Sequence, residues 1–302
     1  MYIEDTNSVA MIKLNKELIN VKYSKEYAIG RKITICKELI KKAKFDELFG
    51  LFLLSLKEKK MKKEASELEQ TPVFCQNYKG RVAVYTCIAG LKEIIPDPLF
   101  VSDSCDYFVF TDNEIASNSI WKKKDIKKMK FPCNNANEIN RYVKLHPHEL
   151  FPEYEYSMYV DGNICIVSDV VPMINQMNEE EFLALHKHDR RTCAYKEAAA
   201  FYHIPRLKKF AKQAKVQMEE YRRQGFPEEF GLFENPIIIR HHNDKECIRL
   251  MELWWKQLVM FSMRDQISLP YAIWKLDIPS SRIHILGKDV RRNPRFIQIE
   301  HE

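Results

Sequence analysis

The chain has 302 residues, of which 45% are hydrophobic and 12% aromatic, enough for one large domain or two smaller ones around a real core. Its formal net charge of +6 at pH 7 is modest, and no nucleic-acid recognition motif accompanies it, so we expect no nucleic-acid partner. Such a charge suits a polyanionic small substrate or the edge of an anionic membrane.

The cysteines and the start of the chain bear on its compartment. The eight cysteines are scattered without close pairs, which is typical of reduced thiols and not of a disulfide framework or a zinc site. The first residues are acidic, so they do not resemble a secretory signal, and the longest apolar run, Leu48–Leu56, is too short to cross a bilayer. We expect a cytoplasmic protein and leave open peripheral contact with the inner face of the membrane.

Residues 1–72 are predicted to form a helical N-terminal extension. The residues Phe45, Leu48, Phe49, Phe52 and Leu56 fall at helical spacing and make one apolar stripe. Such a segment can be a helical cap packed on the main domain, or a helix pair that binds a membrane surface or a partner. Thr71-Pro72 marks the boundary, after which residues 73–302 would form the main domain.

From residue 73 onward, strand-like and helix-like segments alternate. We predict strands at 81–88, 106–112, 154–161, 164–167 and 236–240, and helices at 135–145, 192–203, 206–223, 244–261 and 264–276. This alternation predicts an α/β fold with a mainly parallel sheet. Ligands of such sheets bind beyond the carboxyl ends of the strands, where Gly90, Asp112 and Asp161 fall.

The segment Asp161-Gly162-Asn163 directly follows a strand-like apolar run. Two oxygen-bearing side chains one residue apart can hold a hard divalent cation beside a diphosphate. The same triplet is also a strong signal for a simple turn. Arg141 and Lys144 lie three apart on the preceding predicted helix, so they share a face and could clamp phosphates, or be solvated charges.

Three further polar clusters follow, each compatible with a plainer role. The first, which contains His186, Arg191, Tyr195 and Glu197, can bind metal, phosphate or sugar hydroxyls, or be a polar loop before a capped helix. The second places Glu234 and Asn235 before an apolar run and His241 and His242 after it; a histidine there can bind metal or lie unused at the surface. The third, from Ser262 to Ser268, contains Arg264, Asp265 and Gln266. Asp265 can orient or deprotonate an acceptor hydroxyl, or complete a capping box.

Taken in order, these pieces resemble a glycosyltransferase-like family that includes plant mucilage-related and TOD-type proteins and bacterial proteins from polysaccharide clusters. The matching pieces are Val84–Gly90, Asp106–Asp112, Arg141 with Lys144, Tyr159–Asn163, His186–Glu197, Gly231–Asn235, Arg240–Asn243 and Trp254–Ser268. They span about residues 80–275 and leave out residues 1–70. The resemblance implies a GT-A-like fold, in which a Rossmann-type mixed sheet is flanked by helices.

The resemblance also implies roles for particular residues. It makes Asp161-Gly162-Asn163 the counterpart of the Asp-x-Asp motif of that fold, although Asn163 replaces the second acid, and it favours His242 over His241. Asp161, Asn163 and His242 would then hold a divalent cation, Mn²⁺ or Mg²⁺. The donor would contact Tyr85, Thr86, Gly90, Asp112, Arg141, Lys144, Asp161 and Gly162. The sugar or acceptor would contact His186, Arg191, Tyr195, Glu197, Asn235 and Gln266, and catalysis would use Asp265, Arg264 and Glu234.

We therefore expect a glycosyltransferase that moves a hexose-like sugar from a UDP-sugar to a surface-glycan acceptor, either a glycan or a lipid-linked saccharide. One alternative is a hydrolase that uses the same carboxylates and histidines to activate water. Another is a catalytically silent protein that binds glycans or partners. Stabilisation of the protein by UDP with manganese would favour transfer over hydrolysis, and saccharide or protein binding without release of a nucleoside diphosphate from any donor would indicate the binding protein.

Overall fold

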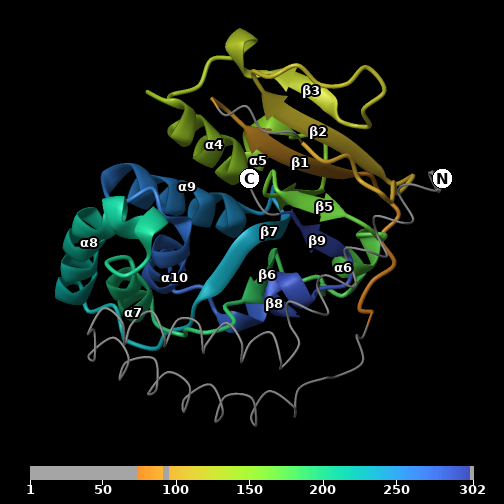
Figure 1. Cartoon of the computed structure of the whole chain (residues 1–302). Helices are drawn as coiled ribbons and strands as arrows, with labels where there is room; N and C mark the ends of the chain where they lie inside the picture. Colours follow the sequence, from red (N-terminus) through yellow and green to blue (C-terminus); the bar gives the residue numbers. More distant parts are fainter. Residues whose placement is uncertain (1–73, 91–94, 300–302) are drawn as a thin grey trace, which may run out of the picture. The chain divides into compact units, whose positions relative to one another are not determined.

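The computed structural model describes residues 74–90 and 95–299, and all structural statements below refer to these residues (Figure 1). The predicted N-terminal helices lie outside the described residues. The core element is a seven-stranded sheet in the order β3-β2-β1-β4-β7-β6-β8. Its strands are β1 (Val82–Ile88), β2 (Cys105–Thr111), β3 (Lys122–Asp125), β4 (Tyr156–Val160), β6 (Leu183–Lys187), β7 (Phe233–His241) and β8 (Ile283–Lys288).

The direction of the strands decides which residues can meet. The pairs β1–β2, β2–β3, β1–β4 and β6–β8 are parallel, whereas β7 is antiparallel to both β4 and β6. The carboxyl ends of β1, β2, β4 and β6 therefore share one edge of the sheet with the amino end of β7. We call this the carboxyl edge, and the other the amino edge.

The central strands are buried on both faces, which is why their sequences are mostly apolar. Every residue of β1, β2 and β4 is buried. The helices α4 (Ala136–Leu145), α9 (Lys245–Met260) and α10 (Asp265–Lys275) cover one face, where Val143, Trp254 and Leu269 pack with Tyr85. On the other face Val84 packs with residues of α6 (Val171–Asn175) and of a small antiparallel sheet formed by β5 (Ile164–Ile166) and β9 (Phe296–Gln298).

A third apolar cluster joins α10 to α7 (Ala194–Ala200) and α8 (Ala211–Arg223). The remaining elements are α5 (Pro147–Leu150) and four 3₁₀ segments at Ile126–Lys128, Pro205–Phe210, Ser280–Arg282 and Val290–Arg292. No helix among the described residues is long and apolar enough to span a bilayer. The predicted fold class, a mixed α/β sheet flanked by helices, is confirmed.

The predicted elements match the structure best where the sequence is most periodic. The expected helices at 135–145, 244–261 and 264–276 correspond to α4, α9 and α10 within two residues at each end. The strands β3, β6, β8 and β9 were not predicted. The residues of β3 are Lys-Lys-Lys-Asp, which have no strand-like composition, and this edge strand forms through its parallel pairing with β2.

Candidate active site

At the carboxyl edge, the loop after β1 is fixed to the end of β2 and to the start of α4. The Gly90 N–H donates to Asp112 Oδ1 at 3.0 Å, and the Ala89 N–H donates to Asn140 Oδ1 at 3.2 Å. Gly90 has φ +69°, and an added Cβ would lie 2.7 Å from Cβ of Ala136. Only glycine satisfies both the left-handed backbone and the close approach of α4. Gly90, which was predicted to meet the donor, is therefore held in place at the end of β1.

The Asp161-Gly162-Asn163 segment forms a turn that contacts three other segments of the chain. The Asp161 N–H donates to the Pro236 carbonyl at 2.8 Å, which seats the turn beside the amino end of β7. An added Cβ on Gly162 would lie 2.6 Å from Cδ1 of Ile88, so the turn packs directly against β1. Asn163 Nδ2 donates to the Ile299 carbonyl at 3.2 Å, which anchors the segment after β9. The turn interpretation and the site interpretation of this triplet are compatible.

Beside this turn lies a network of four charged side chains from three parts of the chain. Lys144 Nζ, on α4, is 2.7 Å from Asp265 Oδ2, at the first residue of α10, and 3.5 Å from Asp161 Oδ1. Arg141 Nη1, one turn earlier on α4, is 3.8 Å from Asp265 Oδ2. The Lys144 side chain is 1% exposed, whereas Asp161 keeps 36% of its side chain exposed. The network thus runs from the buried interior to a partly open carboxylate.

The network holds Asp265 in its ionised form. Burial by itself would raise the pKa of the Asp265 carboxyl, but Lys144, Arg141 and Arg264 outweigh it and keep the pKa well below its usual range. The Lys144 ammonium also lies 4.8 Å from the centre of the Tyr159 ring. Burial, and next the nearby Asp161, raises the pKa of the Tyr159 hydroxyl well above its usual value, so this group stays neutral. The site is therefore built from fixed charges beside the turn.

Several buried polar atoms near this edge have no hydrogen-bond partner among the described residues. They are Thr86 Oγ1 on β1, His186 Nδ1 on β6, and both amide atoms of Asn235 on β7. Thr86 Oγ1 would lie 3.8 Å from a Cβ on Gly162, which places it beside the turn. Buried polar groups are normally paired, so this edge offers hydrogen-bonding capacity to a ligand.

Glu234 and His186 face each other in the pairing of β6 with β7. Glu234 accepts from the Val290 N–H at 3.0 Å and lies 3.4 Å from Arg291 Nη1. Burial, followed by the charge of Asp289, raises the pKa of Glu234. His186 Nε2 lies 3.1 Å from Asn293 Nδ2, and burial lowers the His186 pKa to about 4. The segment 289–293 was not singled out in the sequence, since its polar residues follow no strand or motif that would mark them.

Among the residues between 186 and 197 that were predicted to bind sugar, Arg191 and Glu197 form a second, largely buried ion pair. Arg191 Nη1 lies 2.6 Å from Glu197 Oε2, and His188 Nε2 lies 3.9 Å from the same oxygen. The Tyr195 hydroxyl donates to the Phe226 carbonyl at 2.7 Å and so bonds within the α7–α8 region. Gln266 is half-buried at the second residue of α10. Among the described residues, no hydrogen bond or ion pair joins Arg191, Tyr195 or Glu197 to the Lys144 network.

Two predicted site residues lie elsewhere than expected. Because β7 is antiparallel to β4, His241 pairs with Tyr156, and His242 follows it at the amino edge, away from Asp161. His242 is fully buried, its Nε2 lies 2.9 Å from the Phe151 carbonyl, and burial lowers its pKa to about 4. The placement of His242 beside Asp161 and Asn163 as a metal ligand is therefore wrong.

Tyr85 is the second displaced residue. Its side chain is fully buried under α4, where the hydroxyl donates to the Lys144 carbonyl at 3.0 Å and accepts from Arg240 Nη2. Arg240 Nη1 also donates to the Lys144 carbonyl, at 2.8 Å. Tyr85 therefore holds the end of α4 and does not face the donor side of the site. Arg240 was quoted only as part of a motif, since its burial could not be read from the sequence.

The divalent cation implied by the family resemblance can be tested against the remaining ligands. Asp161 offers one carboxylate oxygen besides Oδ1, which faces Lys144, and Asn163 offers its amide oxygen because Nδ2 donates to Ile299. Oxygen ligands of this kind suit Mg²⁺ or Mn²⁺. The two residues fit such an ion, with fewer charges than a pair of carboxylates would supply.

Comparison with solved structures gives distant likenesses. The apo structure of WbbM, a bifunctional glycosyltransferase, matches with 13% identity and a TM-score of 0.42, covering 77% of this chain and 47% of that one. The apo form of mouse xyloside xylosyltransferase 1 matches with 10% identity and a TM-score of 0.39, covering 68% of this chain and 84% of that one. This chain spans about half the length of WbbM. Both TM-scores lie below 0.5, so neither likeness identifies a function.

The sequence itself carries the clearer relationship. No curated protein matches it. A family model described as the TOD1/MUCI70 glycosyltransferase-like domain matches residues 57–301. This range is wider than the resemblance read from the motifs, and the predicted boundary at residue 72 lies inside it. The chain belongs to the TOD1/MUCI70 glycosyltransferase-like family and is a transferase enzyme.

Proposed function

We propose that this glycosyltransferase moves a hexose-like sugar from a UDP-sugar to a surface-glycan acceptor at the carboxyl edge of its sheet. The observation that carries the proposal is the pair of buried contacts from Lys144 to Asp265 and Asp161, beside the turn that ends β4. Transfer from a nucleoside diphosphate builds negative charge on two phosphates, and preorganised cations lower that cost. Lys144 and Arg141 are such cations, already fixed by Asp265 before any donor arrives.

The donor would lie over the ends of β1 and β4. The unpaired Thr86 hydroxyl beside Gly162 and the fixed loop of Gly90 and Asp112 supply hydrogen-bonding groups for the nucleoside. Asp161 and Asn163 would hold the divalent cation, which, when bound, offsets charge on the leaving diphosphate. The side chain of Asp161 is the exposed end of the charged network, as this role requires.

Asp265 and Glu234 differ in the chemistry that they can perform. The pKa of Asp265 is held far below neutrality, so its carboxylate is a weak base, and we assign it the positioning of Lys144, Arg141 and the acceptor hydroxyl. Arg264 contributes positive charge beside it. Burial raises the pKa of Glu234, so this carboxylate is a stronger base than Asp265, and we assign it proton transfer. His186, Asn235 and Gln266 would contact the sugar or the acceptor.

The acceptor is proposed to be a glycan or a lipid-linked saccharide that the enzyme meets in the cytoplasm, at the inner face of the membrane. All seven cysteines of the described residues are free, which fits a reducing compartment. The side chains of Arg191, Tyr195 and Glu197 would then shape the acceptor region through α7.

The test compares Asp161→Ala with Asp103→Asn in the full chain. Asp103 is exposed before β2, at the amino edge, and serves as the matched control. We expect UDP with Mn²⁺ to raise the melting temperature of the wild type and of Asp103→Asn, and Asp161→Ala to lose this shift. Release of UDP from a UDP-sugar should fall about 100-fold or more in Asp161→Ala.

Each rival function has its own outcome in the same experiment. A hydrolase would consume an ester, amide or phosphate substrate without any stabilisation by UDP and Mn²⁺. A silent binding protein would bind saccharide and release no UDP from any donor. Full activity of Asp161→Ala would show that the turn after β4 takes no part in the reaction.

A further inference from the structure

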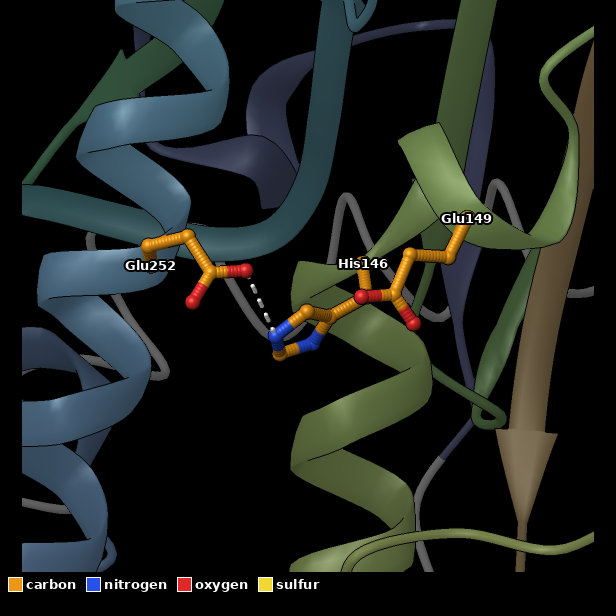
Figure 2. Close-up of side chains that lie close together, drawn as sticks. All are labelled: His146, Glu149 and Glu252. Atoms are coloured by element: carbon orange, nitrogen blue, oxygen red, sulfur yellow. Dashed lines mark ion pairs between the residues drawn. The ribbon is translucent and has the colours of Figure 1, made fainter.

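A second cluster of ligand-type side chains lies where the end of α4 and α5 pack against α9 (Figure 2). One potential ligand atom from each of His146, Glu149 and Glu252 lies within 4.8 Å of the other two. A second histidine joins them, since His148 Nε2 is 3.6 Å from Glu252 Oε1. These residues were not singled out in the sequence, and they play no part in the proposed transfer reaction.

The hydrogen bonding of His146 fixes which nitrogen is free to bind. Its Nδ1 lies 2.8 Å from the Tyr142 carbonyl, which can only accept, so Nδ1 must carry the proton. In the neutral ring, Nε2 then presents a lone pair, and this lone pair faces Glu252 Oε1 at 3.4 Å. The His146 ring is buried and Glu252 is partly exposed, and two acceptors that face each other repel unless a cation lies between them.

The distances match metal ligation better than hydrogen bonding. Hydrogen bonds between nitrogen and oxygen are about 2.7–3.2 Å long. Two ligand atoms each about 2.0–2.1 Å from a tetrahedral zinc ion lie about 3.3–3.4 Å apart. The separations of Glu252 Oε1 from His146 Nε2 and His148 Nε2 are 3.4 and 3.6 Å. One ion can therefore lie between Glu252 Oε1 and His146 Nε2, with a Glu149 oxygen in the same cluster, and His148 would join it by a movement of its side chain towards Glu252.

The groups around the cluster hold its ligands in place. The Tyr142 hydroxyl donates to Glu149 Oε2 at 2.5 Å, and the Tyr142 ring stacks on His146 with 3.8 Å between the ring centres. The Trp255 ring packs edge-on against both of these rings. Such partners behind the ligands orient them for a metal. The buried Nδ1 of His148 has no partner among the described residues, so this imidazole is not committed to another bond.

We propose that His146, His148, Glu149 and Glu252 form a binding site for a divalent transition metal of the zinc type. Two neutral imidazoles and two carboxylates carry a charge of about −2, which one such ion balances, and the ligand set of nitrogen and oxygen atoms suits Zn²⁺. The site contains no cysteine.

The role of this metal would be structural. It would clamp the end of α4 and the short helix α5 to α9, and α4 carries Arg141 and Lys144. The ion would thereby hold the helix that supplies the cations of the site. This inference does not rest on the proposed function, because metal binding is measured without any sugar nucleotide.

The experiment measures Zn²⁺ and Co²⁺ bound to the full chain and to two matched variants. Glu252→Gln removes one proposed ligand, which has 37% of its side chain exposed. Glu155→Gln removes a carboxylate that faces a single histidine, His241, at 3.7 Å. After metal loading and desalting, elemental analysis should find about one equivalent less zinc in Glu252→Gln than in the wild type or in Glu155→Gln. Co²⁺ should give visible absorption bands of a nitrogen and oxygen site, and Glu252→Gln should lose them.

Two further variants keep the result interpretable. The wild type and Glu252→Gln are also compared in an Asp161→Asn background, so that an ion bound at the turn after β4 is not counted. His148→Gln replaces a second ligand and should reproduce the loss of one equivalent if Glu252→Gln folds poorly. Equal zinc content in all folded variants, or cobalt absorption typical of thiolate ligands, would overturn the proposal, whatever the outcome of the UDP experiments.

Discussion

The ammonium group of Lys144 lies 2.7 Å from Asp265 Oδ2, and both side chains are almost wholly buried although the two residues lie 121 positions apart in the sequence. Breaking a buried ion pair by removing one partner leaves an uncompensated charge, whereas replacing both by apolar residues does not. The contact therefore links the stability of the domain to the site beside Asp161.

The first prediction concerns this pair. Lys144→Met should lower the free energy of unfolding by about 3–5 kcal/mol, because Asp265 stays buried without its closest counter-charge. The double variant Lys144→Met with Asp265→Leu should recover much of that loss. Urea denaturation at neutral pH measures both. The control is Lys215→Met, which removes an exposed helical pair with Glu219 and should change stability by less than about 0.5 kcal/mol. A Lys144→Met protein as stable as the control would contradict this account.

The second prediction separates backbone strain from crowding. Gly90 and Gly225 both have positive φ, +69° and +89°, but only at Gly90 would an added Cβ meet a neighbour, Ala136. Gly225→Ala should cost about 1–2 kcal/mol from the left-handed backbone alone. Gly90→Ala should cost more, and it should weaken UDP binding because the loop shifts from Asp112. Equal losses of stability in thermal denaturation would show that α4 does not restrict this loop.

The third prediction tests the internal role of Tyr85. Tyr85→Phe removes the hydroxyl that accepts from Arg240 and donates to the Lys144 carbonyl, so a buried guanidinium loses a partner. We expect a loss of about 1–3 kcal/mol in stability. The dissociation constant for UDP, measured by calorimetry, should change less than about twofold, as it should for the exposed Tyr202→Phe. A large loss of UDP affinity with unchanged stability would show that Tyr85 contacts the donor after all.

The fourth prediction is a pH dependence that arises from His186. Burial lowers its pKa to about 4 in the folded state, whereas an unfolded histidine titrates near 6.5, so the unfolded chain binds the additional proton between these values. The contribution of neutral His186 to the free energy of unfolding is therefore fully present above about pH 6.5 and is lost as the pH falls toward 4. Protonation would also break the contact of Nε2 with Asn293 Nδ2, while Asp289 nearby opposes the shift.

Denaturation curves between pH 7 and 4 measure this effect. His186→Gln should flatten the decline in stability by an amount on the order of 3 kcal/mol over that range. His203→Gln, at an exposed position, is the control and should leave the decline unchanged. An identical decline in His186→Gln and the wild type would show that His186 is not neutral in the folded protein.

Much of the fold could be predicted because local patterns are strong in the central elements. The residues of β1, β2 and β4 are mostly apolar, which is the pattern of strands buried on both faces, and α4 and α9 begin at side-chain caps, Asn135 and Asp244. The strand β3 could not be predicted, since its lysines form a strand only by pairing with β2. In the same way, His146 and Glu252 meet only because α4 packs against α9.

The sequence by itself determined the family, the α/β class and the turn Asp161-Gly162-Asn163 at a strand end, because these depend on residue types and on spacing along the chain. Only the tertiary structure decided which charged groups share a site. The direction of β7 sends His242 to the far edge of the sheet, and the packing of α4 and α10 brings Lys144 to Asp265. Strand direction and helix packing are fixed by contacts between distant segments, which short-range patterns do not encode.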